Sequence, residues 1–313
     1  MSDSTPAAER TFRSFTKDQG ANYAKNRSGY HPNLFKTITD YHTSTGGQLN
    51  TLLDVGCGPG TAARALAPHF AHAIGLDPSQ GMINNAVLLA GASSTGEPIR
   101  FEISTAEDLG SHLSPPVQDS SVDLITAAAA AHWFDMTRFW LQAARVLRPG
   151  GTVALWTPGS ISIHPSMPNA AAIQAAMDDI EERETKPFFE PGNLLTRSLY
   201  IGLPLPWALA QPVIDFDETS FFRKEWGPEN SEEFLADSAL TIDLDMMEKV
   251  LGTASPVQRW RDAHPDAVGT ESDVVRMMRR EIERLLHEAG VEKGKEVVKG
   301  SLEGVLLMVK KKA

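Results

Sequence analysis

The sequence predicts an α/β fold in which helices cover both faces of a mostly parallel β-sheet. Short apolar runs that suit strands buried on both faces recur at 51–55, 72–77, 99–103, 121–126 and 152–156. Patterns typical of helices separate most of these runs, for example at 61–70 and 136–147. The first run also passes directly into a glycine-rich turn. Alternating strands and helices of this kind predict βαβ units with parallel strands.

Length and composition are those of an ordinary globular protein. The chain has 313 residues, of which 42% are hydrophobic and 22% charged, which suits one large α/β domain with insertions or one domain with a cap. The net charge of −11 argues against a nucleic-acid partner, since the only basic cluster is Lys310–Lys312. A single cysteine excludes an internal disulfide framework and gives no sign of a cysteine-based metal site.

The sequence shows no targeting or membrane segment. Residues 1–10 are polar and lack the charged-then-apolar pattern of a signal peptide. No apolar run approaches the roughly 20 residues of a membrane span. We therefore expect a soluble cytoplasmic protein that binds no metal, membrane or nucleic acid; its oligomeric state stays open.

The turn after the first strand has a distinctive glycine spacing. The strand 51–55 carries Asp54, and glycines follow at positions 56, 58 and 60. Glycine has no Cβ, so such a turn can bend sharply and approach a ligand closely. The helix behind it directs its free N–H groups at whatever the turn holds. A dinucleotide-binding turn has the spacing G-x-G-x-x-G, and its third glycine would fall on Thr61.

This D-x-G-x-G-x-G pattern resembles the first motif of class I S-adenosylmethionine (SAM) methyltransferases. The resemblance implies a Rossmann-like, seven-stranded sheet, mostly parallel with an antiparallel last strand, and a helical insertion over the acceptor pocket. It also implies that the turn faces the methionyl part of SAM, with Asp54, Gly56, Gly58 and Gly60 as cofactor-binding residues. A tight structural turn without a ligand is the alternative, and Cys57 within it is expected to be a small apolar filler.

Acidic and apolar residues after the second and third strands extend the resemblance. Asp77 ends the second strand, where an acid can accept hydrogen bonds from both ribose hydroxyls of an adenosine. The D-x-S-x-x-M pattern at 77–82 resembles SAM enzymes in which the methionine packs on the adenine. The resemblance thus implies that Met82 contacts the adenine. Asp77 could also cap the next helix. After the third strand, we expect the backbone of Ala106 and the side chain of Glu107 to meet the adenine amino group.

A segment before the first strand resembles the Y-A-x-x-R-P-x-Y-P opening of the fungal trans-aconitate methyltransferase-like family. Tyr23, Arg27 and Tyr30 match it, whereas Ser28 replaces the first proline. In that family the segment lies over the cofactor and acceptor pocket. The resemblance thus implies that Tyr23 and Arg27 bind the cofactor, Arg27 by clamping its carboxylate, and that Tyr30 faces the acceptor. Surface packing is the alternative for each.

The fourth strand ends in five alanines, 127–131, followed by His132 and Trp133. Small residues there leave room for a ligand, which in open α/β sheets lies at the carboxyl ends of strands. The His-Trp pair resembles the same trans-aconitate-like family, where it lies beside the methyl donor. His132 is the candidate catalytic base for an acceptor that holds its proton. A packed histidine without a catalytic role is the alternative.

Beyond residue 157 the simple alternation ends. We expect helices near 169–183, 232–251 and 271–289, a sixth strand within 213–226 and the last strand at 304–310. An earlier helix is expected at 33–42. The predicted organisation is a disordered lead (1–11), an N-terminal lid and helix (12–50), the SAM-binding core (51–157), an insertion that shapes the acceptor pocket (158–210), and the remaining strands with C-terminal helices (211–313).

The resemblance points to small carboxylic acids as methyl acceptors, giving methyl esters. A carboxylate needs a nearby cation, for which Arg27, Arg197 and Arg223 are candidates, with Trp133 and Trp156 as further acceptor contacts. A carboxylate is already ionised and needs no base. Methylation of a hydroxyl, thiol or carbon remains open, as does a non-catalytic SAM-binding regulator. An NAD(P)-linked oxidoreductase is disfavoured by the glycine spacing.

Overall fold

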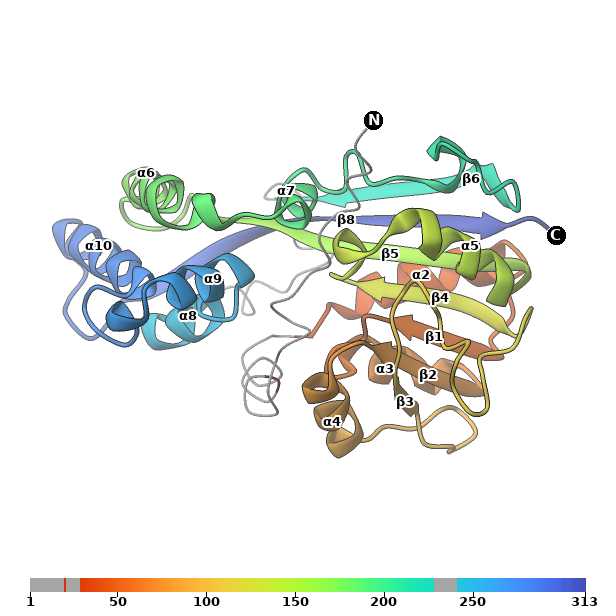
Figure 1. Cartoon of the computed structure of the whole chain (residues 1–313). Helices are drawn as coiled ribbons and strands as arrows, with labels where there is room; N and C mark the ends of the chain where they lie inside the picture. The colour runs from red at the N-terminus through yellow and green to blue at the C-terminus, as the bar shows by residue number, and fades with distance from the viewer. Residues whose placement is uncertain (1–19, 21–28, 228–240) are drawn as a thin grey trace.

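A computed structural model describes residue 20, residues 29–227 and residues 241–313. One mixed sheet runs through the molecule in the order β3-β2-β1-β4-β5-β8-β6, and β7 pairs with β8 outside this path (Figure 1). The first five strands pair in parallel, whereas β8 is antiparallel to both β5 and β6. The predicted α/β fold with a mostly parallel sheet and an antiparallel last strand is therefore confirmed. The strands are β1 (Thr51–Val55), β2 (His72–Asp77), β3 (Arg100–Ile103), β4 (Val122–Ala128), β5 (Leu147–Ile163), β6 (Phe216–Trp226), β7 (Thr241–Asp243) and β8 (Val297–Lys311).

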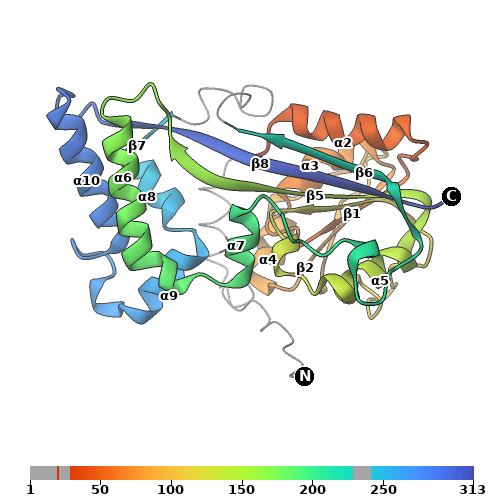
Figure 2. The ribbon, with the colours of Figure 1, turned by 90° about the horizontal axis from the view of Figure 1, so that it is seen from above.

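Helices cover both faces of the sheet, as predicted (Figure 2). On one face, α2 (Pro32–Ser44), α3 (Thr61–Leu66) and α4 (Gln80–Leu89) bury residues such as Ile38, Leu66 and Ile83 in a shared core. On the other face, α5 (Met136–Val146) buries Phe139 and Trp140, and α7 (Pro191–Arg197) packs beside them through Leu195. Two separate apolar cores therefore hold the sheet between them.

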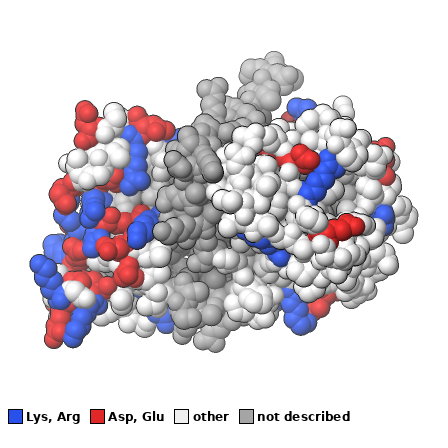
Figure 3. Space-filling view, turned by 90° about the horizontal axis from the view of Figure 1, so that it is seen from below, with Lys and Arg blue, Asp and Glu red and all other residues white. Residues whose placement is uncertain are grey.

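A second, helical lobe is built on the far ends of β5 and β8. These two strands form a long antiparallel ribbon that continues past the rest of the sheet (Figure 1). Four helices gather at its end: α6 (Ala170–Ile180), α8 (Leu244–Leu251), α9 (Ser255–Ala263) and α10 (Val274–Glu288). Ile173 of α6 and Ile282 of α10 share one of the small cores of this lobe. On the face seen in Figure 3, acidic and basic side chains alternate over the lobe, whereas fewer charged side chains lie over the sheet.

The fifth strand differs from the prediction. It was expected to begin at Thr152 after a turn at 147–151 and to end at Trp156, but β5 spans Leu147–Ile163. Leu147 pairs with Val122, and the next pairing joins Thr152 to Leu124. The residues between Leu147 and Thr152 therefore form an irregularity within the strand, because more residues lie on β5 than on its partner.

The bounds of other helices and strands also differ from the predicted ones. The helix expected at 61–70 ends at Leu66 and tightens into a 3₁₀ turn at Ala67–His69, since Pro68 cannot donate a helical hydrogen bond. Residues 241–243, expected within a helix, form β7. The last strand begins at Val297 rather than Gly304. Helix α9 was not predicted. The expected disordered lead lies outside the described residues.

Within residues 29–227 and 241–313, no helix is long and apolar enough to cross the membrane. The same ranges hold no group of three or more His, Cys, Asp or Glu side chains arranged to bind a metal ion.

Candidate functional site

The turn between β1 and α3 is held in a conformation that favours glycine. Gly56, Gly58 and Gly60 all have positive φ angles, of 63°, 53° and 84°. Gly60 is also the N-cap of α3, and its N–H donates to the Cys57 carbonyl at 2.9 Å. Cys57 itself is buried, and burial raises the pKa of its thiol, as suits an apolar filler rather than a nucleophile.

Only one of the three glycines faces open space. A Cβ on Gly56 would lie 2.6 Å from the Ala130 Cβ, and a Cβ on Gly60 would lie 2.7 Å from the Phe101 ring. A Cβ on Gly58 would meet no described atom within 4 Å. Gly56 and Gly60 are thus required by packing, whereas Gly58 leaves its backbone exposed for a ligand to approach.

Asp54 braces the turn from inside the sheet. Its side chain is fully buried; one carboxylate oxygen accepts from the Thr126 hydroxyl at 2.7 Å and the other from the Ala63 N–H at 3.1 Å. These bonds join β1 to β4 and to the first turn of α3. Burial raises the pKa of Asp54 to about 7, although both hydrogen bonds act in the opposite direction. The structure therefore gives Asp54 an indirect part in the site, through the shape of the turn.

Asp77 lies at the tip of β2, directly beside the turn. Its Oδ2 accepts from the Gly58 N–H at 2.9 Å, and its Oδ1 accepts from the Ser79 N–H at 2.8 Å. The N-cap of α4 is Ser79, whose hydroxyl accepts from the Met82 N–H at 3.3 Å, so Asp77 is not the cap. The predicted ribose-binding acid and the one glycine that faces open space are therefore neighbours. Met82 is buried behind them.

A hydrogen bond joins the segments that follow β3 and β4, at the edge of the sheet where both strands end. Ala106 is buried, and the Glu107 carboxylate accepts from the Asp135 N–H at 2.9 Å. Asp135 is the N-cap of α5 and follows the His132-Trp133 pair. Glu107 thus fixes the loop that carries His132, in addition to its predicted role toward adenine.

His132 lies in a short 3₁₀ turn, Ala131–Trp133, just beyond β4. The preceding Ala130 is the residue against which Gly56 packs, so this turn adjoins the glycine turn. The His132 ring lies 4.6 Å from the Trp133 ring, centroid to centroid, and its Nδ1 is 3.1 Å from the Tyr200 hydroxyl. Burial lowers the pKa of His132 to about 3, so the imidazole is neutral at neutral pH.

Tyr200 is a residue of the site that the sequence did not predict. It is buried at the end of the α7 segment, in a left-handed conformation with φ of 61°, and burial raises the pKa of its phenol. Its hydroxyl also bonds to Thr157 and faces the backbone amides of Ala131 and His132. The surrounding insertion has no clean period, and no local pattern marks this tyrosine.

The contact between His132 and Tyr200 is compatible with both neutral tautomers of His132. The phenol oxygen can accept from an Nδ1–H, which leaves Nε2 as an acceptor, or the phenol can donate to an unprotonated Nδ1. In both cases the hydrogen bond holds the imidazole ring against Tyr200.

The insertion packs directly on the His132-Trp133 pair. A Cβ on Gly192 of α7 would lie 2.5 Å from the Trp133 ring and 2.8 Å from the His132 carbonyl oxygen. The absence of a side chain at Gly192 therefore lets α7 approach this corner of the site closely.

Several predicted acceptor contacts are not brought together with His132. Trp156 is fully buried in the core on the α2 face, where its ring packs edge-on against Tyr30 at 5.4 Å, whereas Tyr200 lies in the core on the opposite face. Arg197 pairs with Glu181 and lies over the Phe189 ring at 4.7 Å. Arg223 bonds to Glu225 and donates to the Leu199 carbonyl at 2.8 Å. Tyr23 and Arg27 lie outside the described residues.

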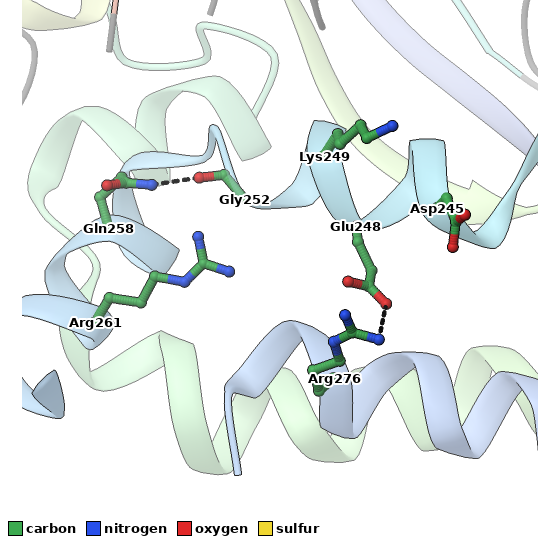
Figure 4. Close-up of a pocket in the computed structure, with 7 residues that line it drawn as sticks. All are labelled: Asp245, Glu248, Lys249, Gly252, Gln258, Arg261 and Arg276. Carbon is green, nitrogen blue, oxygen red and sulfur yellow. Dashed lines mark hydrogen bonds and ion pairs between the residues drawn. The ribbon is translucent and has the colours of Figure 1, made fainter. Parts of the chain in front are cut away.

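The helical lobe has a surface pocket of its own (Figure 4). Its lining comes from α8, α9 and α10 and from the turn between α8 and α9. Glu248 pairs with Arg276 at 3.1 Å across it, and the Gln258 amide bonds to the Gly252 carbonyl. None of its residues belongs to the glycine turn, the tip of β2 or the exit of β4. Asp245, Glu248, Lys249, Gly252, Gln258, Arg261 and Arg276 line it.

The sheet order, the glycine turn after β1 and the acid at the tip of β2 are those expected of a class I methyltransferase domain. Residues 53–155, about a third of the chain, match the family model described as "Methyltransferase domain". This part of the chain is therefore similar to methyltransferase domains, and SAM is the cofactor that its turn and Asp77 fit.

Named relatives that match just under half of the chain are described as methyltransferases. A Saccharomyces cerevisiae protein described as a probable S-adenosylmethionine-dependent methyltransferase is 33% identical over 138 residues, covering 44% of this chain and 45% of that protein. The malonyl-[acyl-carrier protein] O-methyltransferase of Dechloromonas aromatica is 33% identical over 155 residues, covering 49% and 51%. The chain thus spans about half the length of the curated relatives it matches.

A solved structure extends the likeness of fold to almost the whole chain. It comes from Anaeromyxobacter dehalogenans and is described as a candidate type II methyltransferase. The TM-score is 0.58 at 23% sequence identity, over 90% of this chain and 97% of that one. The helical lobe and the antiparallel strands therefore belong to a fold that is known elsewhere.

Proposed function

We propose that this chain transfers the methyl group of SAM to a small-molecule carboxylate, giving a methyl ester, as in the trans-aconitate methyltransferase-like family. The observation that carries the cofactor half of the proposal is the Gly58 backbone, which faces open space beside Asp77. Any larger residue at position 58 would fill that space. The relative named for O-methylation of a malonyl group supports the acceptor half.

When bound, SAM supplies an electrophilic methyl group on a positively charged sulfur. The residues of this chain bind and orient it. The glycine turn lets the ligand approach the backbone, and Asp77 is assigned to the ribose hydroxyls. Holding the cofactor and acceptor in line can lower the barrier by about 7–11 kcal/mol. The close packing of α7 at Gly192 supports Trp133 and the His132 backbone from the side of the insertion.

The site also favours a second candidate, methylation of a hydroxyl or thiol. Such an acceptor holds its proton at neutral pH and needs a base. In the tautomer whose Nδ1–H donates to Tyr200, His132 Nε2 is able to accept that proton. A carboxylate acceptor would not use this nitrogen, since it has no proton to lose at neutral pH.

Calorimetric titration with S-adenosylhomocysteine, the expected product, tests the cofactor half. We expect micromolar binding by the natural chain and at least 30-fold weaker binding by Asp77→Ala. Asp119→Ala is the matched control, because Asp119 is an exposed aspartate that forms an ion pair with Arg145 of α5. Equal affinity in all three proteins would remove Asp77 from the site, and no binding at all would refute the cofactor assignment.

A second assay decides between the acceptors. Release of S-adenosylhomocysteine is measured with panels of small carboxylic acids, alcohols and thiols, for the natural chain and for His132→Gln. Turnover of a carboxylic acid that survives His132→Gln supports ester formation. Turnover of an alcohol or thiol that is lost in the variant supports the second candidate. Tight product binding without turnover of any panel member would favour a SAM-binding regulatory protein.

A further inference from the structure

A cleft lies at the end of the sheet opposite the glycine turn. It is bounded by the C-terminal end of α2, by β6 and by the last residues of β8, and its volume is about 540 Å³, within the usual range for small-molecule sites. The glycine turn follows the carboxyl end of β1, whereas Gly150, which lines the cleft, lies near the amino end of β5. The two regions share no lining residue. Tyr41, Thr45, Gly150, Asp217, Thr219, Ser220, Phe221, Phe222, Lys310, Lys311, Lys312 and Ala313 line the cleft.

Lys310 is the unusual residue of this cleft. Its side chain is only 7% exposed, and its ammonium nitrogen has no hydrogen-bond partner among the described residues. It lies on the α2 face of the sheet, because Met308, two residues earlier on β8, packs in the core on that face. Burial lowers the pKa of Lys310. A buried ammonium without a partner is unfavourable, and proteins normally pair such a group.

The neighbouring polar groups already have partners. The Tyr41 hydroxyl donates to the Ser220 carbonyl at 2.5 Å, and the Ser220 hydroxyl donates to the Asp217 carbonyl at 2.5 Å. The Asp217 Oδ1 accepts from both the N–H and the hydroxyl of Thr219. His42 bonds to Thr152 at 2.7 Å and to the Gln48 carbonyl at 2.9 Å. The local network therefore leaves the three ammonium donors of Lys310 unused.

The other two lysines of the cleft have different roles. The Lys311 ammonium donates to the Ala144 and Leu147 carbonyls at 2.6 and 2.8 Å, at the end of α5 on the opposite face of the sheet. Lys312 is exposed. By contrast, two of the cations of the pocket in the helical lobe are paired, Arg261 with Asp273 and Arg276 with Glu248. Lys310 is thus the one buried lysine in either pocket without a partner among the described residues.

We propose that this cleft is a second ligand site, which binds a small monocarboxylate with an apolar body and uses Lys310 as the counter-charge. One buried cation matches one negative charge, and the Asp217 carboxylate in the same cleft disfavours a dianion such as phosphate. The rings of Tyr41 and Phe222, 5.4 Å apart, provide an apolar wall for the body of the ligand.

Benzoate is a suitable probe, since it combines one carboxylate with an apolar ring. Calorimetric titration of the full chain should give one-to-one binding at about 1 mM, within the usual limits for so small a ligand. Lys310→Met should weaken this binding at least 10-fold, because the variant keeps the apolar stem and loses the charge. Lys312→Met, the matched control in the same cleft, should change it less than twofold. Benzyl alcohol, the neutral analogue, should bind at least 10-fold more weakly.

A second measurement uses the natural chain alone and does not depend on the variants. Between pH 8 and pH 10, pairing with the carboxylate should raise the lowered pKa of Lys310, so binding should take up a growing fraction of a proton as the pH approaches that pKa. Titrations in buffers of different ionisation enthalpy measure this uptake. Binding without proton uptake would contradict the proposal.

Further outcomes separate this site from the proposed acceptor pocket, which could itself admit a carboxylate. Asp77→Ala should leave benzoate binding within twofold while it weakens binding of S-adenosylhomocysteine. Benzoate affinity unchanged in Lys310→Met, no binding up to 20 mM, or tighter binding of inorganic phosphate than of benzoate would each overturn the proposal.

Discussion

The glycine turn and the helical lobe of this chain are held together by different kinds of contact. At the turn, two buried carboxylates, Asp54 and Asp77, accept hydrogen bonds from backbone N–H groups and a hydroxyl. In the lobe, arginine–carboxylate pairs join the helices in addition to their small apolar cores. Arg279 alone pairs with Asp245, Glu248 and Glu283 on two helices. The interspersed charges of Figure 3 show the same arrangement on the surface.

This difference indicates how the two regions can vary. A buried carboxylate that holds the backbone fixes the position of a ligand, and any replacement there disturbs the site directly. Arginine pairs on an exposed surface are individually weak and can be exchanged with little effect on the rest of the fold. In the proposed function, the rigid region binds the methyl donor, and the role of adapting to an acceptor falls to the lobe and the insertion.

The largest expected effect is at Gly58. Gly58→Ala should weaken binding of S-adenosylhomocysteine at least 100-fold, because the new methyl group occupies the open space beside Asp77. It should also cost about 1 kcal/mol of stability, since alanine is unfavourable at positive φ. Calorimetry and thermal unfolding measure the two effects separately.

Gly46→Ala is the matched control for this prediction. Gly46 also has a positive φ, of 86°, and a Cβ there would meet no described atom within 4 Å. It lies in the loop after α2, away from the turn. This variant should lose similar stability and keep its affinity for S-adenosylhomocysteine. Equal loss of affinity in both variants would mean that the Gly58 effect comes from strain alone.

The next largest expected effect is a loss of stability caused by a substitution in the helical lobe. Arg261→Met should destabilise the chain by about 2 kcal/mol, because it leaves the buried Asp273 carboxylate without its cation. Arg261 bonds to both oxygens of Asp273, at 2.9 and 3.1 Å, and Asp273 is the N-cap of α10. Urea unfolding measures the loss. Arg284→Met, which removes an exposed ion pair with Glu281 on α10, should change stability little.

The same variant sharpens the comparison between the two regions. Affinity for S-adenosylhomocysteine should stay within twofold in Arg261→Met. A parallel loss of affinity would show that the lobe and the glycine turn unfold or deform as one unit, which would contradict their separation.

The fold of the first half was predictable because its signals are local. The run 51–60 contains the strand, the turn and the start of the helix, and the strand His72–Asp77 was predicted to the residue. The lobe was harder to predict, because its contacts join distant segments. Arg279 and Asp245 lie 34 residues apart, and β7 is a strand only because it pairs with Val297–Lys299 of β8.

A third prediction concerns pH. The pKa of Asp54 is raised from an ordinary aspartate value to about 7, so the unfolded chain releases this proton first as the pH rises. The contribution of Asp54 to stability is therefore present at about pH 4 and is lost as the pH approaches 7. Asp54→Asn cannot titrate, so its stability relative to the natural chain should rise by about 1 kcal/mol per pH unit between pH 5 and 7.

Urea unfolding at pH 5, 6 and 7 measures this difference. Asparagine can keep both hydrogen bonds, by accepting from the Ala63 N–H and donating to Thr126, so the variant should fold. Asp119→Asn, at an exposed position, is the control and should track the natural chain. Parallel stability curves for Asp54→Asn and the natural chain would show that the Asp54 carboxyl group does not titrate in this range.

The candidate site was only partly predictable, for a related reason. Gly58 follows β1, and Asp77 is the last residue of the adjacent strand β2. The local motif at the end of each strand was therefore enough to predict that the two residues are neighbours. Tyr200 reaches His132 from 68 residues away, through an insertion without a period. Trp156 was expected to contact the acceptor, but alternation along β5 directs it into the core on the α2 face. A side chain at a strand end can face either core, and the motif does not decide which.

The smallest expected effect, and the most local, is at Tyr200. Tyr200→Phe removes the hydroxyl that bonds to His132 Nδ1, at a cost to stability of about 1 kcal/mol. The natural chain should show a single neutral tautomer of His132, which has the proton on Nδ1 if His132 is the base. The variant should show a mixture, because nothing then distinguishes the two nitrogens. Nitrogen-15 NMR of labelled histidine reports the tautomer, with the His132 signal assigned by its loss in His132→Gln.

Tyr41→Phe is the control, since it also removes a phenol hydroxyl that has a hydrogen-bond partner, here the Ser220 carbonyl on the other face of the sheet. It should leave the His132 signal unchanged. An unchanged tautomer ratio in Tyr200→Phe would show that Tyr200 only packs against the ring, and His132 would then lose its assigned orientation as a base. A shifted ratio would instead show that the insertion, through one buried phenol, sets the proton-accepting nitrogen beside the cofactor turn.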